Sequence, residues 1–255
     1  MTTRVLLLGG TGRTGGRVLA RLLGGGVPVR ALVRSASRLP AGTAGLAGLE
    51  VVEAELASLS QGERLDLVRG CGAIVSCLGH KPDLRGVFGQ PRDLINHATE
   101  ILCRAVAESR PPAPVKFILM SSVLVNRPGR ADSRRGTPER ALLGLMRALV
   151  PPARDHQRAA DFLVREIGPA DTFLRWVVVR PDSLVDGEVS RYELEEGIVS
   201  GLAKPDRTAM ANVAHFICEL VAEPRAWGSW EGRMPVIVDA PSMKRARTPM
   251  ERSES

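Results

Sequence analysis

Three glycines at regular spacing follow an apolar run near the start of the chain. The stretch VLLLGGTGRTGG covers Val5–Gly16, and it holds the pattern G-x-x-G-x-x-G. Such glycines allow a sharp turn after a strand, close approach of backbone N–H groups to a pyrophosphate, and tight packing of the next helix. The positive end of that helix attracts phosphate. The pattern predicts a dinucleotide site, with a tight ligand-free turn as the alternative. The residues predicted to form it are Gly9, Thr11, Gly12, Arg13, Thr14 and Gly15.

Two arginines follow the second apolar run, in the stretch ALVRSASR. NAD-binding proteins carry an acidic residue at the end of this strand for the ribose 2′-hydroxyl, and this stretch has no carboxylate. The guanidinium groups of Arg34 and Arg38 suit a 2′-phosphate instead, because they can donate two hydrogen bonds each to it. We therefore expect NADP(H) as the cofactor; two arginines on a solvated loop are the alternative.

The elements that must position these residues alternate between two kinds. Helical patterns separate short apolar runs, an alternation typical of a parallel sheet with helices on both faces. The predicted strands are Arg4–Leu8, Val29–Val33, Leu49–Glu53, Ala73–Cys77, Val115–Ser121 and Leu174–Arg180. The predicted helices are Arg13–Leu23, Leu59–Val68, Arg92–Glu108 and His156–Ile167. The fold class predicted is α/β, a single Rossmann-type doubly wound parallel sheet.

Two stretches depart from this alternation. Residues 126–152 begin with a loop rich in Arg, Gly and Pro, and then predict a helix with Thr137 as N-cap, ended by Pro151 and Pro152. We interpret them as a loop and helix inserted into a domain spanning residues 1–240. Residues 241–255 are polar and lack periodicity, which predicts a disordered tail.

Composition excludes several classes of protein. The net charge is +7, yet no basic stripe alternates with aromatic residues and no nucleic-acid-binding motif is present, so an attraction for anionic small molecules explains it better. Four cysteines lack C-x-x-C spacing and sit mainly in apolar segments, which indicates buried thiols. No stretch has the length of a signal peptide or a membrane span. We expect a cytoplasmic protein, monomer or homodimer, that binds neither nucleic acid nor membrane.

Six short motifs together resemble the atypical short-chain dehydrogenase/reductase families that bind NAD(P)H. They are GGTGRTGG, LVRSASRLP, Glu55-Leu56, SCLGH, MSSV and VVRPDSL, and the likeness runs from residue 4 to about 238. The likeness is closest to the biliverdin-IXβ reductase/flavin reductase type and its NmrA-like relatives. It implies that Glu55 and Leu56 flank the adenine, although the family usually has Asp in place of Glu55. It also implies that Cys77, Leu78 and Gly79 pass beside the ribose and pyrophosphate, while Ser121, Ser122 and Pro181 border the nicotinamide.

The catalytic pair of typical short-chain dehydrogenases is missing. That pair is Tyr-x-x-x-Lys, and the one tyrosine here, Tyr192, is followed by Glu193-Leu194-Glu195-Glu196. The segment PPARDHQRAADFL instead resembles a family segment with an Asp-His pair before its helix, matched by Asp155 and His156. His156 is a candidate proton donor because imidazole titrates near neutral pH, and a capping or packing role is the alternative. Ser122 is a second catalytic candidate, for a hydrogen bond to a substrate carbonyl or the nicotinamide amide. No metal site is expected from His80, His97 or His215, because their spacing assembles no ligand set.

These observations predict an NADPH-dependent reductase. The hydride acceptor is expected to be flat or conjugated, such as a flavin, quinone or bilin-like molecule, for which solvent or a weak donor can furnish the proton. A non-catalytic protein that senses NADP and regulates a partner is the first alternative. An epimerase, dehydratase or isomerase that uses bound nucleotide is the second. The identity of the acceptor is left open.

Overall fold

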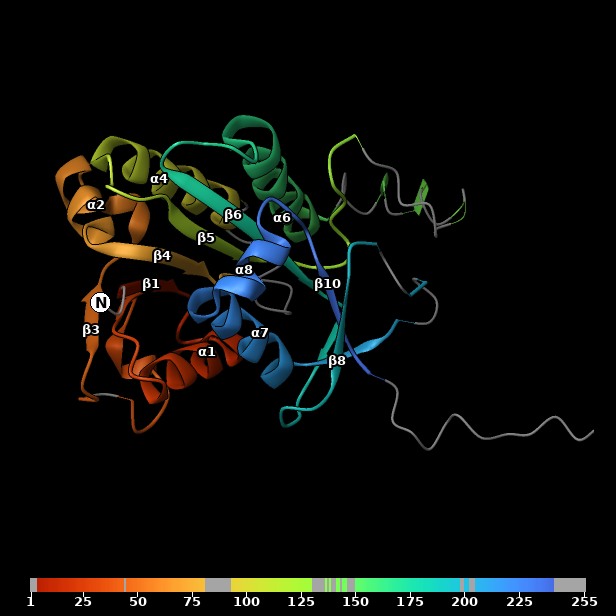
Figure 1. Ribbon diagram of the computed structural model, residues 1–255, viewed down its shortest axis with the longest axis horizontal. Coiled ribbons are helices and arrows are strands. Elements are labelled where there is room, and N and C mark those ends of the chain that lie inside the picture. Colours follow the sequence, from red (N-terminus) through yellow and green to blue (C-terminus); the bar gives the residue numbers. More distant parts are fainter. Residues whose placement is uncertain are drawn as a thin grey trace, which may run out of the picture.

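A mostly parallel sheet forms the centre of the molecule (Figure 1). The computed structural model describes residues 4–43, 45–80, 93–129, 136, 138, 141–142, 144–145, 150–197, 200–201 and 205–240. Within them the sheet order is β3-β2-β1-β4-β5-β6-β10-β8, and β8 runs antiparallel to β10. The strands are β1 (Arg4–Leu8), β2 (Val29–Val33), β3 (Leu49–Glu53), β4 (Cys71–Ser76), β5 (Val115–Met120), β6 (Leu174–Pro181), β8 (Tyr192–Glu195) and β10 (Val236–Asp239). The strand order reverses between β1 and β4, as in a Rossmann-type fold.

Two helical layers cover the sheet, one on each face (Figure 1). One layer contains α2 (Gln61–Val68), α4 (Leu94–Ser109) and α6 (Pro151–Phe162), which continues into the π-helical turn η3 (Leu163–Ile167). The other contains α1 (Arg13–Gly24), α7 (Met210–Ala222) and α8 (Pro224–Trp230). Central strands are apolar along their whole length because both of their faces are buried. In β1, for example, Val5, Leu6 and Leu7 are 0% exposed.

The fold class and most predicted elements are confirmed. The bounds of β1, β2 and β3 match the predicted ranges, whereas α2 begins two residues later than predicted. The cause is Ser60, which forms a capping box with Glu63 and so starts the helix after itself. A small parallel pair, β7 (Ser183–Val185) with β9 (Arg207–Ala209), lies beyond β6 and was not predicted.

Pro151 and Pro152 begin α6, because proline has no N–H and a fixed φ that suit the first helical turn. Most of the helix that they were predicted to end lies outside the described residues. Asp155 and His156 therefore lie inside α6, whereas the prediction placed them at its start. The inserted helix after Thr137 and the tail at 241–255 lie mostly or wholly outside the described residues.

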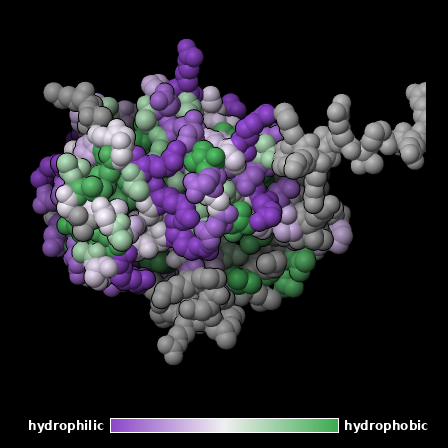
Figure 2. Space-filling view, turned by 90° about the horizontal axis from the view of Figure 1, so that it is seen from below, coloured by the Kyte–Doolittle hydropathy of each residue, from purple (hydrophilic) through white to green (hydrophobic). Residues whose placement is uncertain are grey.

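The surface of the α1, α7 and α8 layer is mixed in polarity. Figure 2 shows the molecule from this side: hydrophilic residues cover much of the centre, and hydrophobic residues gather in separate patches. Within the part of the chain that the structure describes, no helix has the length and apolarity to cross a membrane.

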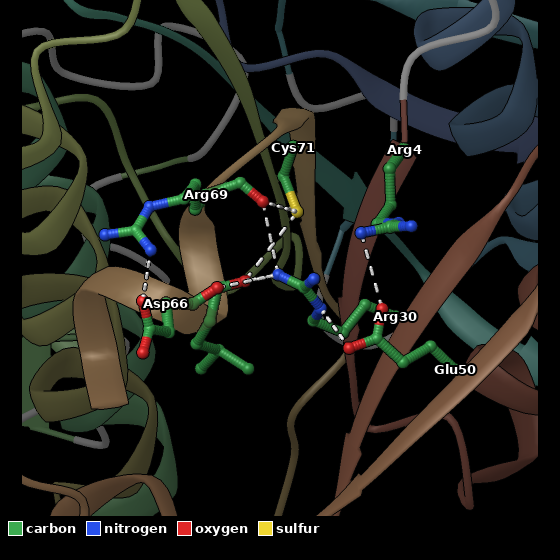
Figure 3. A network of polar contacts seen from close by, with 7 residues as sticks. Arg4, Arg30, Glu50, Asp66, Arg69 and Cys71 are labelled. Atoms are coloured by element: carbon green, nitrogen blue, oxygen red, sulfur yellow. Dashed lines mark hydrogen bonds and ion pairs between the residues drawn. The ribbon is translucent and has the colours of Figure 1, made fainter. Parts of the chain in front are cut away.

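The amino-terminal edge of the sheet is closed by a polar network around Arg30 (Figure 3). The Arg30 guanidinium donates to the carbonyl oxygens of Asp66, Leu67 and Arg69, at the end of α2, and to the carboxylate of Glu50. A cation at this position satisfies carbonyl groups that have no partner within the helix.

Candidate functional site

The glycine turn is packed so tightly that two of its residues have no room for a side chain. Gly9 has a φ of 77°, and a Cβ there would lie 2.4 Å from the carbonyl oxygen of Cys77. A Cβ on Gly15 would lie 2.1 Å from the carbonyl oxygen of Gly9. The turn thus lies against the end of β4, at the point where the strand order reverses. Open α/β sheets bind ligands at this point.

The helix after the turn begins without a side-chain cap. Gly12 is the N-cap of α1 and provides no side-chain hydrogen bond, so the first N–H groups of α1 remain available to a ligand. Thr14 is buried, whereas Thr11 is partly exposed and Arg13 is exposed. An uncapped helix start behind a compact glycine turn fits the pyrophosphate of a dinucleotide.

An acidic residue from a distant segment meets the start of α1. Asp186, just after β7, accepts from Arg13 Nη2 at 2.6 Å and from Arg17 Nη2 at 3.1 Å. Arg13 was predicted to contact the cofactor, whereas Asp186, which is 173 residues away along the chain, was not predicted. All three side chains are at least 37% exposed, so solvent screens the pairs.

The residues expected near the adenosine end lie at the carboxyl ends of β2 and β3. Arg34 and Arg38 are exposed, Arg34 directly after β2 and Arg38 at the end of η1 (Ala36–Arg38). Glu55 is exposed and precedes η2 (Leu56–Ser58), while Leu56 is buried against the α4 side of the core. The structure thus places all four at the edge of the sheet where the glycine turn lies.

The segment after β4 continues along the same edge. The Cys77 N–H donates to the carbonyl oxygen of Leu8, while Leu78 is partly buried and Gly79 is exposed. Burial raises the pKa of the Cys77 thiol to about 12, so the thiol is not a nucleophile at neutral pH. The hydroxyl of the buried Ser76 has no hydrogen-bond partner among the described residues.

Ser121 and His156 come together beyond β5. The Ser121 hydroxyl lies 3.4 Å from His156 Nδ1. Burial lowers the pKa of His156 to about 4, despite the opposing effect of the neighbouring Asp155 carboxylate. The imidazole is therefore neutral at pH 7, which differs from the expected titration near neutrality. A neutral ring orients a hydroxyl but is a poor source of protons.

Asp155 is buried and closes the start of α4. Its carboxylate accepts from the N–H groups of Ile95 and Asn96, both at 2.9 Å, and lies 2.8 Å from Nε2 of His80. His80, which the sequence analysis considered only as a metal ligand, is thus held at the end of the segment after β4. The Asp-His pair was the available signal for this cluster, but the partner of its aspartate could not be read from the sequence.

Ser122 and Pro181 lie at the neighbouring strand ends. Ser122 Oγ accepts from Leu124 N at 3.2 Å and borders a pocket of about 330 Å³. The same pocket is lined by Val123, Leu124, Asp182, Ser183, Ser200, Gly201 and Pro205. Pro181 is buried, and its carbonyl oxygen accepts from Val123 N. The pocket is small but within the range that holds small organic ligands.

The single tyrosine lies away from these residues. Tyr192 is on β8 and donates to the carboxylate of Glu219 on α7, with His215 Nδ1 at 3.0 Å from its hydroxyl. Burial, with the Glu219 hydrogen bond, raises the pKa of Tyr192. The described residues contain no group of three or more His, Cys, Asp or Glu side chains placed to hold a metal ion.

Solved structures share this architecture. The oxidoreductase YlbE from Lactococcus lactis is 17% identical, with a TM-score of 0.67 and coverage of 94% of this chain and 92% of that one. A wide-type short-chain dehydrogenase/reductase from Veillonella parvula, in complex with NADP, is 14% identical, with a TM-score of 0.64 and coverage of 95% and 96%. The anaerobillin reductase ChuY from Escherichia coli O157:H7 is 20% identical, with a TM-score of 0.63 and coverage of 94% and 100%. At these identities the likeness establishes the fold.

The sequence itself matches a protein family. No curated protein matches the chain. A family model described as NAD(P)H-binding matches residues 9–224. That range includes every residue predicted to contact the cofactor. The chain therefore belongs to the NAD(P)H-binding family.

Proposed function

We propose that this protein is an NADPH-dependent reductase that transfers hydride to a conjugated acceptor. The observation that carries the proposal is the glycine turn, which excludes side chains at Gly9 and Gly15 and leads into the uncapped helix α1. The NADP complex of the Veillonella parvula relative and the reductase activity named for ChuY support it by analogy.

Each part of the edge has a role in this proposal. The turn and the first N–H groups of α1 bind the pyrophosphate, and Glu55 and Leu56 flank the adenine. Arg34 and Arg38 bind the 2′-phosphate. Cys77, Leu78 and Gly79 pass beside the ribose through their backbone. When bound, NADPH supplies a hydride from its nicotinamide ring.

The acceptor end is polar but lacks a strong acid. Ser121, Ser122 and Pro181 border the nicotinamide, and the pocket beside Ser122 receives part of the acceptor. Neutral His156 orients the Ser121 hydroxyl, and the proton comes from solvent. This arrangement suits electron-poor acceptors such as flavins, quinones and bilin-like molecules, which need little acid assistance.

A second candidate is an NADP sensor without turnover. One observation favours it: His156 is neutral, and the Asp155 carboxylate is fully engaged by α4 and His80. Among the described residues this cluster then has a structural role only. The cofactor side is the same in both candidates, so turnover separates them.

The first test is nucleotide binding. The protein is titrated with NADPH and with NADH, and nicotinamide fluorescence reports the binding. Gly15→Ala is expected to weaken both by at least about tenfold, because the new Cβ displaces the turn. Gly24→Ala is the matched control in the same helix, since a Cβ there meets nothing within 4 Å. Thermal melts of both variants verify folding. If neither nucleotide binds to the wild-type protein, the reductase and the sensor both fail.

Cofactor preference and turnover are tested next. Arg34→Glu is expected to abolish a preference for NADPH over NADH, because a carboxylate repels the 2′-phosphate and accepts from a 2′-hydroxyl. Loss of NADPH absorbance is then followed with a panel of flavins, quinones and bilins. Turnover with any of them supports the reductase, and binding without turnover across the panel supports the sensor.

A further inference from the structure

A carboxylate from β3 lies in the loop that follows β2. Glu53 is the last residue of β3 and pairs with Val33, the last residue of β2. Its Oε2 accepts from the backbone N–H of Ala36 at 2.8 Å. Ala36 stands between Arg34 and Arg38, so a negative charge lies in the same short loop as the two guanidinium groups.

This position matters because the loop after β2 faces the adenosine ribose in Rossmann-type folds. The sequence around β2 contains no carboxylate, and the interpretation there favoured a 2′-phosphate. The neighbouring strand supplies one in three dimensions. Glu53 is exposed, and its bond to Ala36 N occupies a backbone donor that a phosphate oxygen would otherwise use.

We propose that Glu53 is a specificity-determining residue that acts against the 2′-phosphate and so limits the preference for NADPH over NADH. The inference rests on the proposed function, since it concerns the nucleotide of the same site. A phosphate monoester carries close to two negative charges at pH 7, so it is repelled by Glu53 and competes with it for Ala36 N–H. The 2′-hydroxyl of NADH is neutral and can donate to a carboxylate. Arg34 and Arg38 favour one nucleotide, and Glu53 opposes them.

Replacement of Glu53 by Gln removes the charge and keeps an oxygen that accepts from Ala36 N. The dissociation constants of NADPH and NADH are measured by fluorescence titration at low salt. Glu53→Gln is expected to tighten NADPH binding roughly three- to tenfold, because exposed charges a few ångströms apart interact to about this extent. NADH binding is expected to change by less than about twofold.

Glu50→Gln is the matched control. Glu50 is exposed on the same strand, but it lies at the other edge of the sheet, with Arg30 and Arg4 (Figure 3). The ratio of the two dissociation constants is expected to stay at the wild-type value. Glu53→Thr is a second variant that removes the charge, with a residue suited to a strand. Thermal melts of all three variants verify folding.

The outcomes are separable. A ratio shifted toward NADPH in both Glu53 variants, with no shift in Glu50→Gln, supports the inference, and a shift toward NADH overturns it. An unchanged ratio in the Glu53 variants, or equal tightening of NADPH and NADH, overturns it while leaving the proposed function intact. Failure of the wild-type protein to bind either nucleotide overturns the proposed function and the inference together.

Discussion

The helix ends at the two ends of the central strands differ in how fully side chains satisfy them. At the amino-terminal edge, cations satisfy the last carbonyl groups of two helices. Arg30 closes α2, and Lys116 Nζ donates to the carbonyl oxygens of Leu220 and Val221 at the end of α7. The Lys116 ammonium also lies 5.0 Å from the centre of the Trp227 ring, which adds a cation–π contact.

At the carboxyl-terminal edge, α1 follows the N-cap residue Gly12 and has no side-chain cap. The tight turn before it excludes side chains where a ligand backbone or phosphate would pass. Among the described residues, side chains thus satisfy both helix ends at the amino-terminal edge and the start of α4 at the carboxyl-terminal edge, whereas the start of α1 has no side-chain cap. The binding edge is thus distinguished by the first N–H groups of α1, which have no side-chain acceptor among the described residues.

The largest effect is expected at the start of α4, which Asp155 caps at the carboxyl-terminal edge. Asp155→Ala is expected to lower the free energy of unfolding by about 3 kcal/mol or more, because it leaves buried N–H groups of α4 and His80 without an acceptor. Urea denaturation measures the loss. Asp161→Ala is the control on the same helix, where the carboxylate accepts only from Gln157 among the described residues. Equal losses in the two variants would contradict a special role for Asp155.

The amino-terminal edge is tested by Arg30→Met. The variant leaves carbonyl groups of α2 without their cation and removes one of the two arginines that pair with Glu50, so we expect a loss of about 2 kcal/mol in unfolding free energy. Nucleotide affinity should not change, because this edge is remote from the glycine turn. Arg104→Met is the control, since Arg104 is 71% exposed and, among the described residues, pairs only with Glu100. The expected loss of unfolding free energy in Arg104→Met is no more than about 0.5 kcal/mol. Weaker nucleotide binding in Arg30→Met would break the separation of the two edges.

The features that the sequence predicted well are local ones. Apolar runs bounded by glycines and prolines were sufficient to place β1, β2 and β3, and the glycine spacing placed the turn. By contrast, β8 was not predicted. In its sequence, Tyr-Glu-Leu-Glu, apolar and acidic residues alternate as in a half-buried strand, but such a short stretch does not indicate its partner. The antiparallel pairing with β10 joins segments that are distant in the chain.

The same limit applies to the site. The strand-end residues were identified, but their protein partners were not. Asp186 reaches Arg13 across 173 residues, and His80 reaches Asp155 across 75. Glu53 reaches Ala36 only because β3 pairs with β2. In each pair, one charged side chain belongs to no recognisable sequence motif. Its partner is determined by how the strands are ordered in space.

A smaller effect is expected from the pH dependence of stability at the binding edge. The pKa of His156 is about 4 in the folded protein and near 6.5 when unfolded, so the unfolded chain binds the proton more readily. The associated stability is present above pH 6.5 and is lost as the pH falls toward 4. Between pH 7 and pH 5 the wild-type protein should lose about 1–2 kcal/mol more than His156→Gln. Urea titrations at both pH values measure this. His97→Gln, at an exposed position on α4, should keep the wild-type dependence.

The smallest effect concerns Asp186, which occupies the arginines beside the uncapped start of α1. If the free donors of this edge serve the pyrophosphate, Asp186 competes with the ligand for Arg13 and Arg17. Asp186→Asn should then tighten NADPH and NADH binding alike, by roughly two- to fivefold, as expected for exposed ion pairs. The gain should shrink at high salt because screening weakens exposed charges. Glu188→Gln is the control: it removes a charge two residues along the chain and should change the affinity for either nucleotide little. Weaker binding in Asp186→Asn would mean that Asp186 holds the arginines in place for the ligand, and that this part of the edge is organised before binding.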